Sequence, residues 1–266
     1  MTLRTLIGCG LAVALYSANV TAASAAGSCS LRSAPHRVAL IELYTSEGCN
    51  SCPPADRWLS ALPQRGVTVE NAVLLAFHVD YWNQLGWPDR FSQARFSDRQ
   101  RTIAARSRSG VIYTPQIVLD GHDLGAGTRP EDLSTAFRSI NAQPARATIH
   151  ADFKRDASSL RVTGDVQVID AGARAESQVW LAIYESGLSS KVTAGENNGK
   201  LLTHDFVVHE LAGPFTVGAD GSGHIDQSLH WASDWNAERT GVAMFVQRRD
   251  SGEIVQAAGL SRLCGS

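Results

Sequence analysis

Two cysteines separated by two residues, Cys49 and Cys52, stand between an apolar run and a helical pattern, and this arrangement constrains the fold most. The apolar run, residues 37–44, has the length and composition of a buried strand. Residues 53–62 begin with two prolines and continue with apolar side chains at helical spacing. The first turn of a helix leaves backbone N–H groups unpaired and positive, which stabilises a thiolate placed there. The pattern is therefore typical of a redox-active dithiol.

The first half of the chain alternates between strand-like and helix-like segments. Residues 71–79 form a near-continuous apolar run, as a strand covered on both faces does. Residues 89–107 carry apolar side chains at helical spacing, and residues 111–119 have the composition of a third strand. A last helix is expected over residues 129–140, with Thr128 as its N-cap. Alternation of this kind predicts an α/β layer fold around a central sheet.

The composition changes near residue 144, and strand-like segments dominate from there to the C-terminus. Glycine-rich turns separate some of these segments, a pattern typical of a β-sandwich. The expected strands cover residues 147–153, 160–168, 178–184, 206–211, 224–229 and 241–247. We therefore expect an α/β domain over residues 27–143, followed by an all-β, sandwich-like domain over residues 144–266.

The N-terminus has the features of a secretory signal peptide. Arg4 gives it a positive start, residues 6–18 are apolar but too short to span a bilayer, and small residues follow at 23–26. We expect residues 1–26 to be removed, which leaves no stable membrane span. The mature protein is then expected in the periplasm or outside the cell. A retained N-terminal membrane anchor is the alternative.

Four cysteines remain after removal of the signal peptide, an even number that suits an oxidising compartment. Four cysteines allow three pairings. We favour Cys49–Cys52 as one disulfide and Cys29–Cys264 as a structural disulfide that ties the two ends of the mature chain together. The alternative is that both terminal cysteines are free in frayed ends.

Cys-x-x-Cys motifs also occur in metal sites, and the sequence gives little support to that interpretation. A structural zinc site needs four ligands. The chain has no second Cys-x-x-Cys motif, and its histidines are scattered without a His-x-x-x-His spacing. We therefore expect no metal site and no cofactor.

A proline interrupts an otherwise strand-like run at Thr114-Pro115. A proline within a strand confines that strand to an edge or requires a special bond. A cis peptide bond resolves the conflict, and the Thr114 backbone is then able to pair with an extended substrate. An ordinary trans proline in an edge strand is the alternative.

Four segments of the chain resemble a known family. They are Glu42 to Asp56, Phe77 to Asp89, Tyr113 to Gln116 and Gly195 to Val208. Through them, residues 37–260 are similar to a secreted thioredoxin-like family catalogued as domain of unknown function 1223. The resemblance implies a thioredoxin-like domain with an attached C-terminal region, and in thioredoxin-like folds a cis-proline loop faces the Cys-x-x-Cys motif. It supplies no substrate, because the function of the family is unknown.

The expected roles of the site residues follow from their positions. Cys49, nearer the surface, is expected to form a mixed disulfide with a partner, and Cys52, inside the first helical turn, to resolve it. Thr114 and Pro115 are expected to line the same site. Glu42, on the strand that leads to the motif, is a candidate for proton transfer by similarity to the acidic residue that thioredoxins bury. An outward-facing strand residue is the alternative for Glu42.

An aromatic-rich loop follows the strand expected over residues 71–79. Loops at the carboxyl ends of strands often line binding sites in open α/β sheets. Tyr81, Trp82 and Trp87 are therefore candidates for an apolar wall that binds a partner, together with Tyr113. The alternative is a small core under a long loop.

These observations predict an exported thiol–disulfide oxidoreductase that exchanges disulfides with a protein partner. A formal net charge of −2 gives no indication of nucleic-acid binding. A non-enzymatic binding module with a structural Cys49–Cys52 disulfide stays open as an alternative, as does a copper-handling protein, since thiolates bind Cu(I) well. The residues between the cysteines, Asn50 and Ser51, fix neither the direction of exchange nor the partner.

Overall fold

Strands outnumber helices in the computed structural model, which describes residues 28–107, 110–126 and 133–263. The α-helices in these ranges are α1 (Pro53–Ser60), α2 (Ala94–Arg106) and α3 (Leu133–Asn141). The strands are β1 (Ser28–Arg32), β2 (Ala39–Thr45), β3 (Ala72–His78), β4 (Gln116–Leu119), β5 (His122–Asp123), β6 (Ala147–Arg155), β7 (Ser159–Val168), β8 (Ser177–Glu185), β9 (Leu188–Lys191), β10 (Leu201–His204), β11 (Val207–Thr216), β12 (Ser222–His230), β13 (Thr240–Arg248) and β14 (Ile254–Leu260). Short 3-10 turns cover Pro63–Arg65, Asn83–Leu85, Arg174–Glu176 and Ala237–Arg239.

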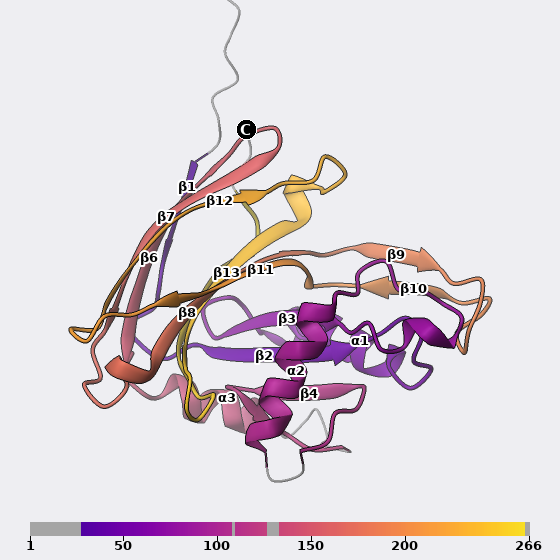
Figure 1. Ribbon diagram of the computed structural model, residues 1–266, viewed down its shortest axis with the longest axis horizontal. Coiled ribbons are helices and arrows are strands. Elements are labelled where there is room, and N and C mark those ends of the chain that lie inside the picture. Colours follow the sequence, from indigo (N-terminus) through magenta and orange to yellow (C-terminus); the bar gives the residue numbers. More distant parts are fainter. Residues whose placement is uncertain (1–27, 108–109, 127–132, 264–266) are drawn as a thin grey trace, which may run out of the picture.

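Two large sheets and one hairpin contain these strands (Figure 1). The first sheet has eight strands in the order β14-β13-β8-β11-β3-β2-β4-β5, and the second has four in the order β1-β6-β7-β12. The hairpin pairs β9 with β10 and projects from the body as an arm beside α1 (Figure 1). In the eight-stranded sheet, β2 and β3 are parallel, β11 joins β3 in parallel through Val207 and Ala76, and the other pairs are antiparallel.

The expected thioredoxin-like α/β domain followed by an all-β domain is wrong. Strands from both sides of residue 144 form one continuous eight-stranded sheet, and strand residues outnumber helical residues over the described chain as a whole. The physical reason lies at β3, whose second edge is taken by β11 from the C-terminal half of the chain. Backbone N–H and C=O groups at a strand edge need partners, and here a distant strand supplies them.

Helices cover both faces of the parallel pair β2 and β3, and every residue of the two strands is buried. On one face, Ile41 and Leu43 of β2 pack in the same cluster as Leu59 of α1. On the other face, Leu40 and Tyr44 pack with α2. Alternate residues of a strand point to opposite faces, so the sequence of β2 already assigns each side chain to one helix or the other.

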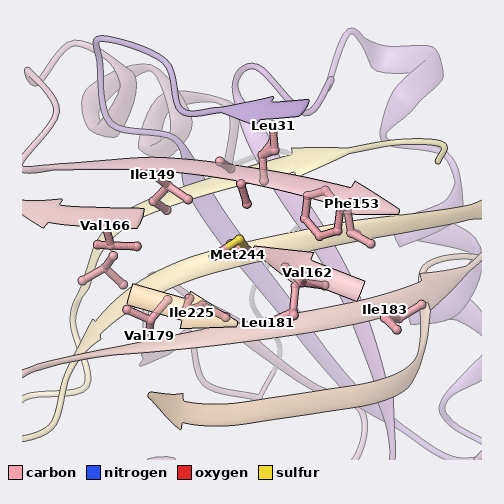
Figure 2. Close-up of a cluster of buried hydrophobic side chains, with 14 of the residues drawn as sticks. Leu31, Ile149, Phe153, Val162, Val166, Val179, Leu181, Ile183, Ile225 and Met244 are labelled. Carbon is pink, nitrogen blue, oxygen red and sulfur yellow. The ribbon is translucent and has the colours of Figure 1, made fainter. Parts of the chain in front are cut away.

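A second core lies between the four-stranded sheet and the β8–β13–β14 end of the larger sheet (Figure 2). β7 alternates between buried and exposed side chains along its whole length, as a strand with one face toward a core does. Phe153 and Val162 face Leu181 and Met244 from the other sheet within this core. We call this set of side chains the inter-sheet core.

The positions of individual elements agree with the sequence predictions more closely than their grouping does. All six strands expected in the C-terminal half are confirmed, within a few residues at their ends except for β11, which continues to Thr216. The helix expected over residues 89–107 is shorter, because α2 begins at Ala94. Thr128 and the proposed signal peptide lie outside the described residues. None of the helices that the structure describes is long and apolar enough to cross a membrane.

Candidate functional site

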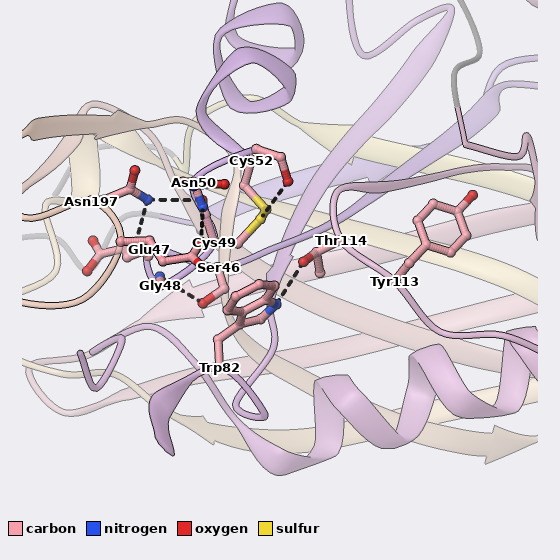
Figure 3. Close-up of a disulfide and its surroundings, with 12 residues drawn as sticks. Ser46, Glu47, Gly48, Cys49, Asn50, Cys52, Trp82, Tyr113, Thr114 and Asn197 are labelled. Atoms are coloured by element: carbon pink, nitrogen blue, oxygen red, sulfur yellow. Dashed lines mark hydrogen bonds between the residues drawn. A yellow bond between two sulfur atoms is a disulfide. The ribbon is translucent and has the colours of Figure 1, made fainter. Parts of the chain in front are cut away.

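The Cys49–Cys52 disulfide lies between the end of β2 and the start of α1 (Figure 3). Cys52 is the N-cap of α1, and Pro53 and Pro54 follow it where a missing N–H group costs no helical hydrogen bond. The Cα atoms of the two cysteines are 5.5 Å apart. Ser51 Oγ lies 3.3 Å from Cys49 Sγ, within hydrogen-bond distance for a sulfur atom. A hydroxyl donor is therefore in place beside the sulfur that stands outside the helix.

Both cysteines are buried, with 0% of their surface exposed. Trp82 lies between the motif loop and Thr114, to whose Oγ1 its Nε1 donates a hydrogen bond of 2.8 Å (Figure 3). A Cβ atom added to Gly48 would be 3.1 Å from Trp82 Cβ, so the indole residue and the motif loop are in close contact. In this conformation a protein partner has no direct path to either sulfur atom.

The loop that joins β9 to β10 covers the motif from the C-terminal half of the chain. Asn197, itself fully buried, donates from Nδ2 to Glu47 O at 2.8 Å and to Cys49 O at 2.9 Å (Figure 3). Glu196 accepts a hydrogen bond of 3.1 Å from Asn50 N. We call residues 192–200 the covering loop. Its contacts fix the backbone on both sides of Cys49.

Five buried titratable side chains gather around the segments that carry the disulfide. His78 Nδ1 and Asp89 Oδ2 are 2.6 Å apart, and His204 Nε2 and Glu47 Oε1 are 3.2 Å apart. Asp89 Oδ2 also accepts from Glu47 N at 2.8 Å, which links the two pairs. Asp56 joins them from α1 and interacts electrostatically with both histidines. We call these residues the buried ionic cluster.

Burial and pairing act against each other in this cluster. Burial raises the pKa of Asp56, although His204 and His78 oppose the shift. Burial works to raise the pKa of Asp89, but its interactions with His78 outweigh burial and the pKa falls. Burial works in the same direction on Glu47, but the hydrogen bonds of Glu47, led by that from His204, outweigh it and lower the pKa. Asp89 likewise overcomes burial to raise the pKa of His78. The shifts of His78 and Asp89 favour the charged form of each, as their 2.6 Å contact does, whereas burial favours the protonated form of Asp56.

Asp56 is the titratable residue of the cluster that is closest to the disulfide along the helix. It follows Cys52 by four residues, and its backbone N–H donates to Cys52 O at 3.1 Å. Residues four apart are neighbours on one helix face. Asp56 is 7% exposed, so its proton is exchanged within a water-poor site. A carboxyl group in this position is suited to give a proton to a thiolate at Cys52 or to take one from the thiol.

Comparison with known proteins places this chain in a family. The family model described as protein of unknown function (DUF1223) matches residues 40–247. The chain belongs to this family. No curated protein matches the sequence.

Two solved structures are similar to this DUF1223 protein. A crystal structure of protein AGR_C_4864 from Agrobacterium tumefaciens shares 24% sequence identity and a TM-score of 0.59, over 85% of this chain and 96% of that one. HBP35 of Porphyromonas gingivalis shares 15% identity and a TM-score of 0.66, over 86% of this chain and 76% of that one. At these identities the likeness concerns the fold alone.

The structure brings some of the predicted site residues of the DUF1223 protein together. Cys49 and Cys52 form the disulfide, and Trp82 and Thr114 lie beside it. The Thr114–Pro115 peptide bond is cis. Trp87 is close as well, because its Nε1 donates to Glu47 Oε2 at 2.8 Å.

Other predicted site residues lie elsewhere. Glu42 points to the opposite face of the sheet from α1, where Oε1 accepts from Arg99 Nε at 2.6 Å. Glu42 therefore faces α2, whereas Asp56 lies on α1, the helix that Cys52 begins. Tyr113 OH donates to Asp123 Oδ1 at 2.8 Å, with its ring turned away from the sulfur atoms (Figure 3). Tyr81 packs against the apolar cluster that Leu40 and Tyr44 form with α2.

Cys29 lies in β1 and contributes to the inter-sheet core. Cys264 is outside the described residues, so the Cys29–Cys264 pairing stays a prediction.

Sequence reasoning missed the covering loop and most of the buried ionic cluster. Asp56 had a readable signal, since it stands four residues after Cys52 in a predicted helix. Asn197 and His204 lie in the segment Gly195 to Val208 that resembles the family, but only the tertiary fold shows that they reach residues 47–49. Within the part of the chain that the structure describes, no group of three or more His, Cys, Asp or Glu side chains is placed to hold a metal ion.

Proposed function

We propose that this protein is a thiol–disulfide oxidoreductase, acting in the periplasm or outside the cell, which exchanges disulfides with a protein partner through Cys49 and Cys52. The observation that carries the proposal is Asp56, a buried carboxyl group with a raised pKa on the helix that Cys52 begins. A disulfide with a purely structural role needs no proton donor at its side. Perturbed titratable groups cluster at functional sites more often than elsewhere.

The exchange begins when a thiolate of the partner attacks Cys49 Sγ. The Cys49–Cys52 bond breaks, a mixed disulfide forms between the partner and Cys49, and Cys52 leaves as a thiolate. Asp56 gives its proton to that thiolate. A second thiol of the partner then loses its proton to solvent and attacks the partner's own sulfur in the mixed disulfide. The partner leaves as a disulfide, Cys49 leaves as a thiolate, and two electrons have passed to the protein; the reverse sequence reduces a partner disulfide.

Access to Cys49 is the second requirement of the proposal. Because both sulfur atoms are buried, the segments packed around them have to move before a partner reaches them, and the covering loop, which holds the backbone on both sides of Cys49, is one of these segments. The contacts that hold it are two hydrogen bonds from Asn197 and one to Glu196. Hydrogen bonds of this kind contribute about 0.5–1.5 kcal/mol each, so transient opening is energetically accessible.

The test is a redox titration of the Cys49–Cys52 pair against glutathione, followed by thiol alkylation and mass spectrometry. An exchanging disulfide is expected above about −300 mV, the region of known oxidoreductases. The Cys52→Ala variant, whose free Cys49 thiolate attacks a disulfide, should accumulate mixed disulfides through Cys49 with a model peptide that carries a disulfide. The double variant Cys49→Ala/Cys52→Ala is the matched control and should accumulate none.

A second function is favoured by one observation, the complete burial of both cysteines. It is a binding module in which the disulfide only fixes the loop between β2 and α1. This alternative predicts a potential below about −300 mV and no mixed disulfide in the Cys52→Ala variant. Those two results together would rule out the oxidoreductase. The copper-handling alternative stays a prediction, to be tested by Cu(I) titration of the reduced protein.

A further inference from the structure

A cavity of about 320 Å³ opens between one face of α2 and the strands β8, β11 and β13. Three arginines of α2 line it, Arg95, Arg99 and Arg106, at the spacing of one helix face. Trp180 and Leu211 line it from the sheet and supply apolar surface. The volume is at the lower end of the range for small-molecule sites.

This cavity is separate from the disulfide site. The next face of α2 makes the contacts toward the cis-proline segment, where Gln100 Nε2 donates to Tyr113 O at 2.8 Å. The cavity residues instead face the strands of the C-terminal half. The inference below therefore does not rest on the proposed exchange of disulfides.

Two of the three arginines already have carboxylate partners. Arg95 makes two hydrogen bonds to Glu210 Oε1, at 2.7 and 2.8 Å. Arg99, with its side chain 7% exposed, pairs with the fully buried Glu42 at 2.6 Å. One acidic residue, Asp98, also lines the cavity, and it is exposed and paired with Arg101.

Arg106 leaves one positive charge for the cavity. Arg106 Nη2 donates a hydrogen bond to a neutral acceptor, Arg249 O, at 2.9 Å. Burial and the nearby charge of Arg99 lower the pKa of Arg106, although Asp250 opposes the shift. A guanidinium group stays protonated at neutral pH even so. An anion in the cavity would oppose the charge repulsion between Arg99 and Arg106.

Two lining residues also hold buried donors without a partner. Arg99 Nη2 and Trp180 Nε1 have no hydrogen-bond acceptor in the protein. The Arg99 guanidinium lies 5.2 Å from the centre of the Trp180 ring, so the two groups are adjacent.

We propose that the cavity beside α2 binds a small organic monocarboxylate, with the carboxylate at Arg106 and an aromatic or short alkyl body against Trp180 and Leu211. One net positive charge selects a monoanion over a dianion. The apolar surface of the sheet selects a carboxylate with a hydrophobic body over an inorganic anion.

The test is a titration of the intact mature protein with benzoate, phenylacetate and hexanoate, followed by ¹H–¹⁵N NMR. The indole N–H resonance of Trp180 is assigned by its loss in Trp180→Phe. At least one of these carboxylates should shift that resonance in a saturable way, and its neutral amide should bind at least tenfold more weakly. Arg106→Gln should weaken carboxylate binding at least tenfold, whereas Arg161→Gln, an equal charge change on β7, should leave it unchanged.

Several results would overturn the proposal. One is the absence of saturable shifts with all three carboxylates, and another is equal binding of the amides, which would mean an apolar cavity without anion selectivity. If Arg106→Gln does not fold, the wild-type protein still decides the matter through the amide comparison. Unchanged carboxylate affinity in a folded Arg106→Gln variant also contradicts the assigned role of Arg106.

Discussion

The buried ionic cluster beside the disulfide and the inter-sheet core are equally inaccessible to solvent, but they are built from different chemistry. His78 is 0% exposed and Asp89 is 4% exposed, and Phe153 and Val162 of the inter-sheet core have 1% and 0%. Among the described residues, no buried polar or charged side chain comes from β6, β7 or β12. The disulfide region, in contrast, buries two carboxylate–imidazole pairs and a further aspartic acid.

The difference separates the part of the molecule that stabilises the fold from the part that is suited to chemistry. Burying hydrocarbon stabilises a protein by about 25 cal/mol per Å² of apolar surface. Burying charge costs several kcal/mol per ion unless partners compensate. The inter-sheet core therefore supplies stability, while the ionic cluster holds titratable groups around the segments that carry the disulfide.

The largest expected effect comes from the apolar region. Phe153→Ala removes a side chain that is 1% exposed and should lower the free energy of unfolding by about 3–5 kcal/mol. The rate at which dithiothreitol reduces the Cys49–Cys52 disulfide in the folded protein should not change. Urea unfolding and the reduction rate at low temperature measure the two quantities. A variant whose reduction rate changed tenfold while it stayed folded would break the separation between the regions.

The second effect comes from the ionic cluster and depends on pH. His78→Gln leaves Asp89 buried without its cation and should cost about 3 kcal/mol, at the low end for a broken buried pair. Asp89 still accepts hydrogen bonds from Glu47 N and Phe91 N.

The sign of the pH dependence follows from the two pKa shifts. The pKa of His78 is raised, so its stabilising contribution is complete below the unfolded value and is lost as pH rises through the folded value. The pKa of Asp89 is lowered, so its contribution is lost as pH falls through the folded value. The stability difference between wild type and His78→Gln should therefore shrink at both ends of the pH range. A difference that stayed constant from acid to alkaline pH would mean that the pair is not ionised.

The smallest expected effect concerns the covering loop. Asn197→Ala removes two hydrogen bonds to buried carbonyl groups and should cost about 1–3 kcal/mol. Because the loop then opens more often, dithiothreitol should reduce the disulfide at least fivefold faster. Asn198→Ala changes an exposed neighbour in the same loop and serves as the control. An unchanged reduction rate in Asn197→Ala would show that this loop does not limit access to Cys49.

Part of the site was readable from the sequence because its residues are close along the chain. Cys49, Cys52 and Asp56 are held together by one loop and one helical turn. Trp82, Trp87 and Thr114 come from segments that the sequence also singled out. Glu42 was a candidate for proton transfer from its place before the motif, but β2 is apolar on both faces, so the strand pattern gave no indication that its side chain faces Arg99 of α2.

Local sequence patterns predicted β2, α1, β3 and six strands of the C-terminal half, but not β9, β10 and β14. Hydrophobic spacing and turn residues act over a few positions, so they can be read without the fold. Only the tertiary structure decided that β11 pairs with β3 and merges the two halves into one sheet. It also decided that Asn197 and His204 reach the disulfide loop. Strand pairing and loop closure join residues more than a hundred positions apart, and no local pattern specifies which distant edge satisfies a given backbone.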